Sequence, residues 1–337
     1  MIFGADTFAG AVAEFEASVQ TRDGERSEGA FTQMRQTFGQ AGADEVAQAA
    51  PRLAALLGEV PPGPRAVAAV VVGACVERGA DPVPCATGVF AVVRDAFEAA
   101  AQFCERWAES GGGDLPDPDQ TELTDDIIDR VGYATALGWW TLQQFQMAAL
   151  ALLNSRTVRQ QLGGKSELLA LVERADEATE GGYKGLSYAL RVLDDEPLVV
   201  LHRESRTGYA LRMTGIGDNF QLHTLLAGAL IGGLHIPGES PSAEAIAVCR
   251  DAEGQAPTTG SFNLVAPDGG WIWNEGTPSD IPVVDGVRLL VLDPPPYQRG
   301  WPAGRYFPHM PGNLVMERVL GAGETAGWFA QVADAKG

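Results

Sequence analysis

The residues with the clearest chemical potential stand together in the segment 218–223 (DNFQLH), at the start of a predicted helix. His223 follows Asn219 by four positions, so the two side chains share one helix face. An imidazole with the Asp218 carboxylate close by suits general base catalysis near neutral pH. The alternative is that Asp218 caps the helix and His223 is a hydrogen-bonded, partly buried side chain. We favour this structural role, and keep Asp218, Asn219 and His223 as the catalytic candidates.

Positive charge for a substrate at this position would come from the hairpin predicted just before the helix. Arg203 follows the first strand of this hairpin, Arg206 lies in its turn and Arg212 belongs to its second strand. A guanidinium group binds carboxylates and phosphates through two parallel hydrogen bonds. One candidate function is therefore an enzyme that acts on a small anionic substrate, with Arg203 and Arg212 as substrate-binding residues.

Aromatic residues gather in the last third of the chain, where they suggest a second kind of site. The candidates for an aromatic groove that binds a peptide or a small molecule are Trp271, Trp273, Trp301, Tyr306 and His309. The last three stand in a segment rich in proline, Trp301–Gly312, which we expect to form a loop over a sheet, where functional residues are common. The alternative is that the aromatic rings form the core of a small domain that has few aliphatic residues, and we favour it.

Motifs for cofactors, metals and common catalytic machinery are incomplete or missing. Gly164-Lys165-Ser166 resembles the end of a phosphate-binding loop, but Arg159 stands where that loop needs its first glycine. Gly215-Ile216-Gly217 resembles a dinucleotide-binding turn, but its third glycine is replaced by Phe220. The four cysteines have no zinc-binding spacing. We therefore expect no cofactor and no metal.

One strongly acidic segment, 105–130, contains nine acidic and two basic residues. A cation site or an acidic docking loop is one interpretation, although the spacing lacks the pattern of a calcium-binding loop. The other interpretation, which we favour, is a solvated loop followed by a helix that begins at Thr124. Asp125 and Asp126 would then stabilise the positive end of that helix.

Net charge excludes several classes of partner. The chain of 337 residues has 44 acidic and 24 basic residues, a formal charge of −20. Such a surface disfavours nucleic acids and anionic lipids, which need clustered Lys and Arg. The first 20 residues lack the basic start of a signal peptide. Val131–Ser155 has no charged residue, but its Thr, Gln and Asn side chains favour a buried helix over a membrane span. We expect a cytoplasmic protein.

The first half of the chain predicts helix after helix. Apolar residues recur with helical period over Thr7–Val19, Ala43–Leu57 and Thr87–Trp107, and a single long helix is expected over Thr124–Asn154. The second half instead predicts strands, which are expected at Pro197–His202, Tyr209–Thr214, Ile246–Arg250, Ser261–Ala266, Trp271–Trp273, Val287–Leu292 and Leu314–Leu320. A helix at Asn219–Leu230 and a closing helix at Glu324–Ala333 interrupt or follow these strands.

These elements predict an α+β protein with two domains. Residues 1–185 form an all-α helical bundle, and residues 186–337 form a smaller α+β domain with a mainly antiparallel sheet. The bundle carries 27 acidic and 14 basic residues, a charge of −13, whereas the second domain carries only −7. We expect an accessory or interaction protein that binds a peptide or protein partner through the second domain. The alternative is the enzyme described above.

Overall fold

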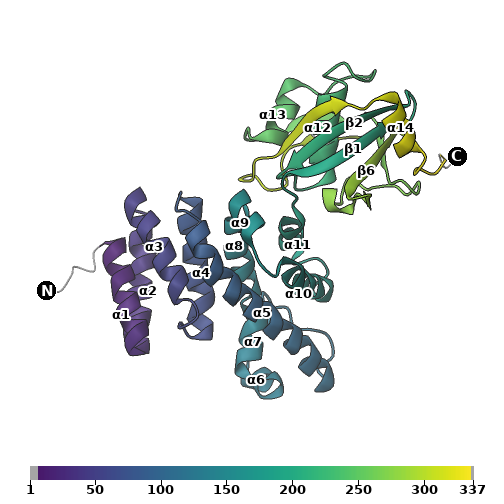
Figure 1. Cartoon of the computed structure of the whole chain (residues 1–337). Coiled ribbons are helices and arrows are strands. Elements are labelled where there is room, and N and C mark those ends of the chain that lie inside the picture. The colour runs from purple at the N-terminus through teal and green to yellow at the C-terminus, as the bar shows by residue number, and fades with distance from the viewer. Residues whose placement is uncertain (1–6, 335–337) are drawn as a thin grey trace. The chain divides into compact units, whose positions relative to one another are not determined.

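The computed structural model describes residues 7–334 and has an α+β fold (Figure 1). The chain folds into two compact units, one ending at Leu190 and the other beginning at Arg191. The boundary lies five residues after the predicted boundary. Each unit is described by itself below.

The first unit is built from helices alone in its described part. They are α1 (Phe8–Thr21), α2 (Gly24–Phe38), α3 (Ala43–Leu56), α4 (Pro62–Glu77), α5 (Val83–Glu109), α6 (Asp125–Val131), α7 (Tyr133–Trp140), α8 (Leu142–Leu153), α9 (Arg156–Gln161), α10 (Lys165–Ala178) and α11 (Lys184–Arg191). Helix α1 packs on α2, α3 packs on α1, α4 and α5, and α8 packs on α4 and α5. The apolar stripes predicted from the sequence supply these contacts.

Close packing between α3 and α5 depends on Gly88. A Cβ atom at this position would lie only 2.1 Å from the carbonyl oxygen of Ala54, which is closer than any real contact. The absence of a side chain therefore lets the two backbones approach each other. Phe90, Phe97 and Phe103 of α5 are all buried and fill the interior of the unit along this helix.

The single helix expected over Thr124–Asn154 is wrong, because the chain forms three shorter helices there. Gly132 separates α6 from α7 with φ at +87°, a conformation that glycine adopts at little cost. Thr141 separates α7 from α8, and its hydroxyl donates to the Leu137 carbonyl at 2.6 Å. The predicted start is confirmed, since the Thr124 side chain accepts a hydrogen bond from the Ile127 N–H. Within residues 7–334, no helix is long and apolar enough to cross a membrane.

Three tryptophans hold the acidic loop between α5 and α6. The indole N–H groups of Trp107, Trp139 and Trp140 donate to backbone carbonyls of that loop at 2.9–3.0 Å. Trp107 and Trp139 also stack on Phe103. The adjacent tryptophans therefore serve as core and as loop anchors. No group of three or more His, Cys, Asp or Glu side chains in the described chain could hold a metal ion.

The second unit contains a mixed, mostly antiparallel sheet with helices on both faces. Its strands are β1 (Glu196–His202), β2 (Thr207–Thr214), β3 (Ala256–Thr259), β4 (Asn263–Val265), β5 (Val283–Val284), β6 (Val287–Asp293), β7 (Gly300–Ala303) and β8 (Asn313–Val319), and its helices are α12 (Asn219–Leu230), α13 (Ala243–Arg250), the 3₁₀ helix Pro278–Asp280 and α14 (Ala322–Phe329). Within residues 7–334, the main sheet has the order β4-β6-β1-β2-β8, with β5 paired to β6, and only β1 and β6 are parallel. A separate pair is formed by β3 and β7.

The two faces of the main sheet carry different cores. Leu198, Val200, Leu211 and Met213 point toward α12 and α13 and belong to the larger core. Val199 and Leu201 point the opposite way, toward Phe329 of α14. This alternation follows from the period of two along a strand. The face of the sheet toward which a side chain of β1 or β2 points therefore follows from the faces of its neighbours along the strand.

Three sequence predictions in this unit are wrong. The segment Ile246–Arg250 belongs to helix α13, because Ser242 caps a helix there by accepting from the Ala245 N–H. Trp271–Trp273 is not a strand and contributes only an isolated bridge between Trp271 and Val265. The segment expected to be a loop after Trp301 begins with strand β7.

Candidate functional site

The start of α12 has the geometry of a capped helix. The Asp218 carboxylate accepts a hydrogen bond from the Gln221 N–H at 2.8 Å, which confirms its capping role. Gln221 is buried, and its side chain accepts from the Gly217 N–H and donates to the Cys249 carbonyl. The Gly217 N–H, in the glycine turn before the helix, is therefore already bonded to a side chain of the protein, that of Gln221.

His223 is enclosed by aromatic rings and has no exposed surface. Its ring stacks on Phe262 at 4.6 Å and meets the edge of Trp301 at 4.9 Å. Its Nε2 accepts a hydrogen bond from the Ser261 N–H at 3.0 Å, so the neutral ring carries its proton on Nδ1. Burial and the positive charge of Arg299 lower the pKa of His223 to about 3, against a smaller opposing effect of Asn274. A group with this pKa is a poor general base at neutral pH.

Asn219 connects α12 to the loop that carries two of the predicted tryptophans. Its side-chain Nδ2 donates to the Trp273 carbonyl at 2.9 Å, and its backbone N–H donates to the Gly276 carbonyl at 3.0 Å. The side chain is completely buried. Asn219, four residues before His223 on the same helix face, therefore holds the Trp273 loop in place rather than acting as a second catalytic group.

Several buried polar atoms beside His223 have no hydrogen-bond partner among the described residues. They are Asn219 Oδ1, His223 Nδ1, both amide atoms of Asn274, and Trp301 Nε1. Buried polar groups of this kind are commonly satisfied by ordered water or by a polar group of a ligand. Because Asn219, His223 and Asn274 are at most 1% exposed, they form an interior cluster with almost no surface of their own.

The predicted arginines lie on the other side of the sheet from His223. Arg212 alternates with Leu211 and Met213, which face α12, so its side chain points toward the α14 face. There its Nε donates to Glu317 and its Nη1 to the Asp195 carbonyl. Arg203 pairs with Asp293 at 2.6 Å and donates to the Ala333 carbonyl, just beyond α14. The structure therefore does not bring the predicted substrate-binding arginines to the catalytic candidates.

Trp271 and Trp273 are exposed on an anchored loop. The two residues are 46% and 59% exposed, and their rings contact each other edge to face at an interplanar angle of 67°, with centroids 5.6 Å apart. Ile272 between them is buried, and its N–H donates to the Leu264 carbonyl. Asn219 holds the Trp273 carbonyl, as described above. The loop backbone is thus held in place while both indole rings face outward.

The other members of the predicted aromatic groove lie in different contacts. Trp301 is half-buried and packs on Phe220 and His223. Tyr306 is 39% exposed and lies against Phe307, and His309 is exposed. Trp271, Trp273, Tyr306 and His309 are therefore exposed, and Trp271 and Trp273 contact each other, whereas Trp301 belongs to the interior cluster.

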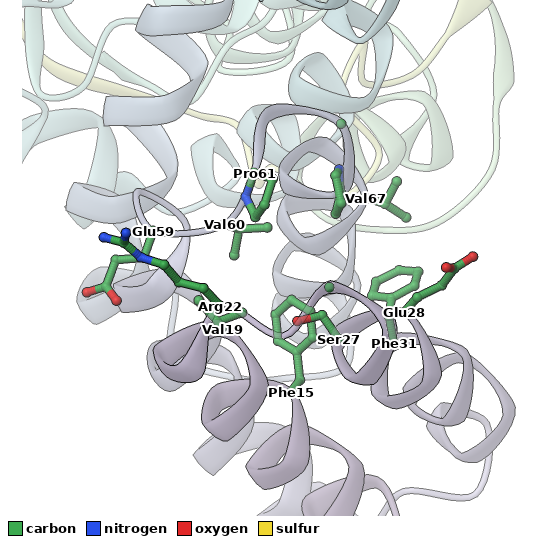
Figure 2. A pocket seen from close by; sticks show the side chains of 13 residues that line it. Phe15, Val19, Arg22, Ser27, Glu28, Phe31, Glu59, Val60, Pro61 and Val67 are labelled. Atoms are coloured by element: carbon green, nitrogen blue, oxygen red, sulfur yellow. The ribbon is translucent and has the colours of Figure 1, made fainter.

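The helical unit contains a hollow that the sequence did not indicate (Figure 2). It has a volume of about 720 Å³ and lies between α1, α2, the α3–α4 connection and α4. Its apolar lining residues are Phe15, Val19, Phe31, Val60, Pro61, Pro64 and Val67. Arg22 and Glu59 stand at one end and Glu28 at the other. Its volume is within the range of small-molecule sites.

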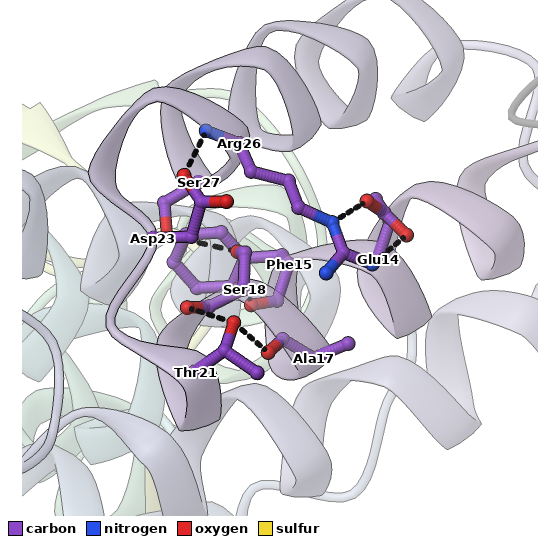
Figure 3. A network of polar contacts seen from close by, with 8 residues as sticks. All are labelled: Glu14, Phe15, Ala17, Ser18, Thr21, Asp23, Arg26 and Ser27. Atoms are coloured by element: carbon purple, nitrogen blue, oxygen red, sulfur yellow. Dashed lines mark hydrogen bonds and ion pairs between the residues drawn. The ribbon is translucent and has the colours of Figure 1, made fainter.

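A polar network holds one wall of this hollow (Figure 3). Ser27 of α2 donates to Ser18 of α1 at 2.8 Å, and Ser18 donates to the Phe15 carbonyl at 2.7 Å. Arg26 forms an ion pair with Glu14 across the same two helices. On the opposite wall, Arg65 donates to the Val60 carbonyl. Contacts from α2 to α1 and from α4 to its preceding loop thus help to keep the hollow open.

No family model, curated protein or solved structure matches this chain.

Proposed function

We propose that this protein is a non-catalytic binding protein whose second unit docks a protein or peptide partner on Trp271 and Trp273. The observation that carries the proposal is the exposure of two neighbouring tryptophans on a loop held by Asn219 and Ile272. Tryptophan is enriched among the residues that dominate binding energy at protein interfaces. An anchored loop also loses little conformational freedom when a partner binds.

The exposed area of Trp271 and Trp273 is large enough to contribute substantially to the binding of a partner. Each tryptophan leaves about half of its surface exposed, which corresponds to roughly 100 Å² per residue. Burying this area contributes roughly 2.5 kcal/mol per residue before the cost of association. The pair therefore supports a contact of moderate affinity that neighbouring residues must extend.

The charge around the pair favours a basic partner. Asp268 precedes the two tryptophans and Glu275 follows them. The faces of indole rings attract cations, and carboxylates beside them add to that attraction. The net charge of the chain, −20, acts in the same direction at longer range. The partner we propose therefore presents an Arg or Lys side chain to this loop.

The enzyme is the less well supported function. It needs His223 as a base and Arg203 or Arg212 beside it, but His223 is sealed in an aromatic cluster and the arginines occupy the other face of the sheet. The Asp218 carboxylate is occupied as a helix cap. Turnover of a metabolite by the purified protein, lost in a His223→Gln variant that still folds, would favour the enzyme again.

The test is affinity capture from native lysate with the purified full chain, followed by purification of the captured protein. The double variant Trp271→Ala/Trp273→Ala is compared with wild type and with Tyr297→Ala, a control aromatic residue that is 54% exposed elsewhere. We expect the partner to be retained by wild type and by the control. Retention should fall at least tenfold in the double variant and should weaken as salt is raised.

A third variant, Val67→Glu, separates this proposal from binding in the hollow of the helical unit, because Val67 lines that hollow and is 38% exposed. If Val67→Glu loses the partner while the double tryptophan variant retains it, the docking surface is the hollow and our proposal is wrong. Failure of wild type to retain any protein that is absent from a bare matrix also contradicts the proposal.

We also propose a cytoplasmic location for this binding. The four cysteines are free, and three of them are buried, which fits a compartment that keeps thiols reduced. To test this location, cells are lysed in acid, which stops thiol exchange, and the free thiols of the protein are then counted. Four free thiols per chain are expected, and an oxidised pair would contradict it.

A further inference from the structure

Strand β8 forms an edge of the main sheet over its whole length. It pairs with β2 on one side, and within residues 7–334 no strand pairs with its other side. The opposite edge, β4, has only three residues and is further covered by the bridge to Trp271. A long edge strand presents unpaired N–H and carbonyl groups to which another strand can add.

The usual protection of an edge is weak along β8. Natural edges are protected by lysine, proline, other charged side chains or β-bulges, and of these β8 has one bulge, at Glu317 near its end. The two charges of β8 are engaged within the chain, since Glu317 pairs with Arg212 and Arg318 forms two hydrogen bonds with Glu324. Val315 and Val319 are instead 48% and 49% exposed. The edge is therefore apolar and neutral on a protein that is acidic overall.

The sequence of β8 is complementary to itself in one antiparallel register. If Val315 lies opposite its own copy, Leu314 lies opposite Met316 of the second copy. Leu314 and Met316 both pack toward the larger core, so the apolar pair forms on one face of the sheet. On the other face, the exposed Val315 lies opposite its own copy. The bulge residue of β8 is Glu317, because Met316 pairs with Leu211 and Arg318 with Ala210, so the regular part of this register is Leu314–Met316.

We infer that β8 is a docking surface for a second copy of this chain, which joins two main sheets through antiparallel β8 strands. Such an interface is symmetric, so every contact occurs twice. The neutral edge is also where two acidic chains approach with little local repulsion. A single strand pair buries less surface than a typical stable dimer, so we expect reversible association at concentrations of roughly 10–100 µM. The Trp271–Trp273 pair takes no part in this interface.

Sedimentation equilibrium of the full chain between about 5 and 200 µM tests the inference. The mass of wild type should rise from 35.6 kDa toward twice that value. Val315→Lys, which places two positive charges opposite each other, should weaken association at least tenfold. The control Val283→Lys, at a residue that is 55% exposed on β5, should associate like wild type. A wild type that stays monomeric at 200 µM, or equal association of both variants, overturns the inference.

A cross-link tests the register itself. Under mild oxidation, Val315→Cys should give a dimer linked by a disulfide, because residue 315 faces its own copy. Val319→Cys is the matched control, since Val319 is equally exposed on the same strand but lies four residues from the symmetry centre. Equal cross-linking of the two variants would contradict the register, even if the chain dimerises.

Discussion

Protonation of His223 should make the second unit unstable in mild acid. The pKa of His223 in the folded protein is about 3, because the ring is buried and Arg299 is close, whereas an unfolded histidine has a pKa of about 6.5. Between these values only the unfolded chain binds the proton. The contribution of neutral His223 to the free energy of unfolding is therefore fully present above pH 6.5, and it is lost as the pH falls toward 3. Between pH 7.5 and 5.0 this linkage removes about 2 kcal/mol, and about 5 kcal/mol at its full extent.

The assay is urea unfolding of wild type and His223→Gln at both pH values, followed by the fluorescence of Trp301 and its neighbours. Glutamine can still accept the Ser261 N–H but does not titrate. The free energy of unfolding should fall about 2 kcal/mol further in wild type than in the variant. His202, whose pKa is also lowered by burial, is present in both proteins, so its contribution to the pH dependence cancels in the comparison. His309→Gln, at an exposed position, should behave like wild type. Equal losses in wild type and His223→Gln would refute the buried, neutral histidine.

Three further predictions concern other parts of the molecule. Asn219→Ala should lower the free energy of unfolding by about 1 kcal/mol and speed hydrogen exchange in the Trp271–Trp273 loop, because the Trp273 carbonyl loses its donor. An unchanged exchange rate would contradict the role of Asn219 in holding this loop. Gly88→Ala should lower stability in thermal unfolding by about 2 kcal/mol or more, whereas Gly29→Ala, with open space at its Cβ, should be neutral or stabilising; equal effects would contradict the close α3–α5 contact. Cys75, whose pKa burial raises to about 12, should resist alkylation at pH 7.5 until the protein unfolds, and rapid labelling would contradict its burial.

Local signals predicted much of the fold. Apolar residues at helical spacing predict α1, α3 and α5, because this spacing reports which helix face is buried, and two short apolar segments on either side of a turn predict β1 and β2. Asp218 and Thr124 were correctly predicted as helix caps, since short polar side chains bond to nearby backbone N–H groups. The change from helices to strands was also visible in the sequence.

Long-range geometry could not be predicted in the same way. The short apolar run Ile246–Arg250 fits a strand or a helix equally, and the packing of α13 beside α12 decides for the helix. Arg212 and His223 are close in sequence, but their separation by the sheet depends on which face α12 covers. The hollow in the helical unit joins α1, α2 and α4, so no single segment of the sequence carries a signal for it.

The most direct test of the central claim is the dissociation constant of the captured partner, measured by titration calorimetry with purified proteins. Truncation of a residue that dominates an interface costs about 2 kcal/mol or more, which is roughly a 30-fold loss of affinity. We predict at least this loss for Trp271→Ala/Trp273→Ala and less than a threefold change for Tyr297→Ala. A double variant that binds within threefold of wild type would contradict docking on the tryptophan pair.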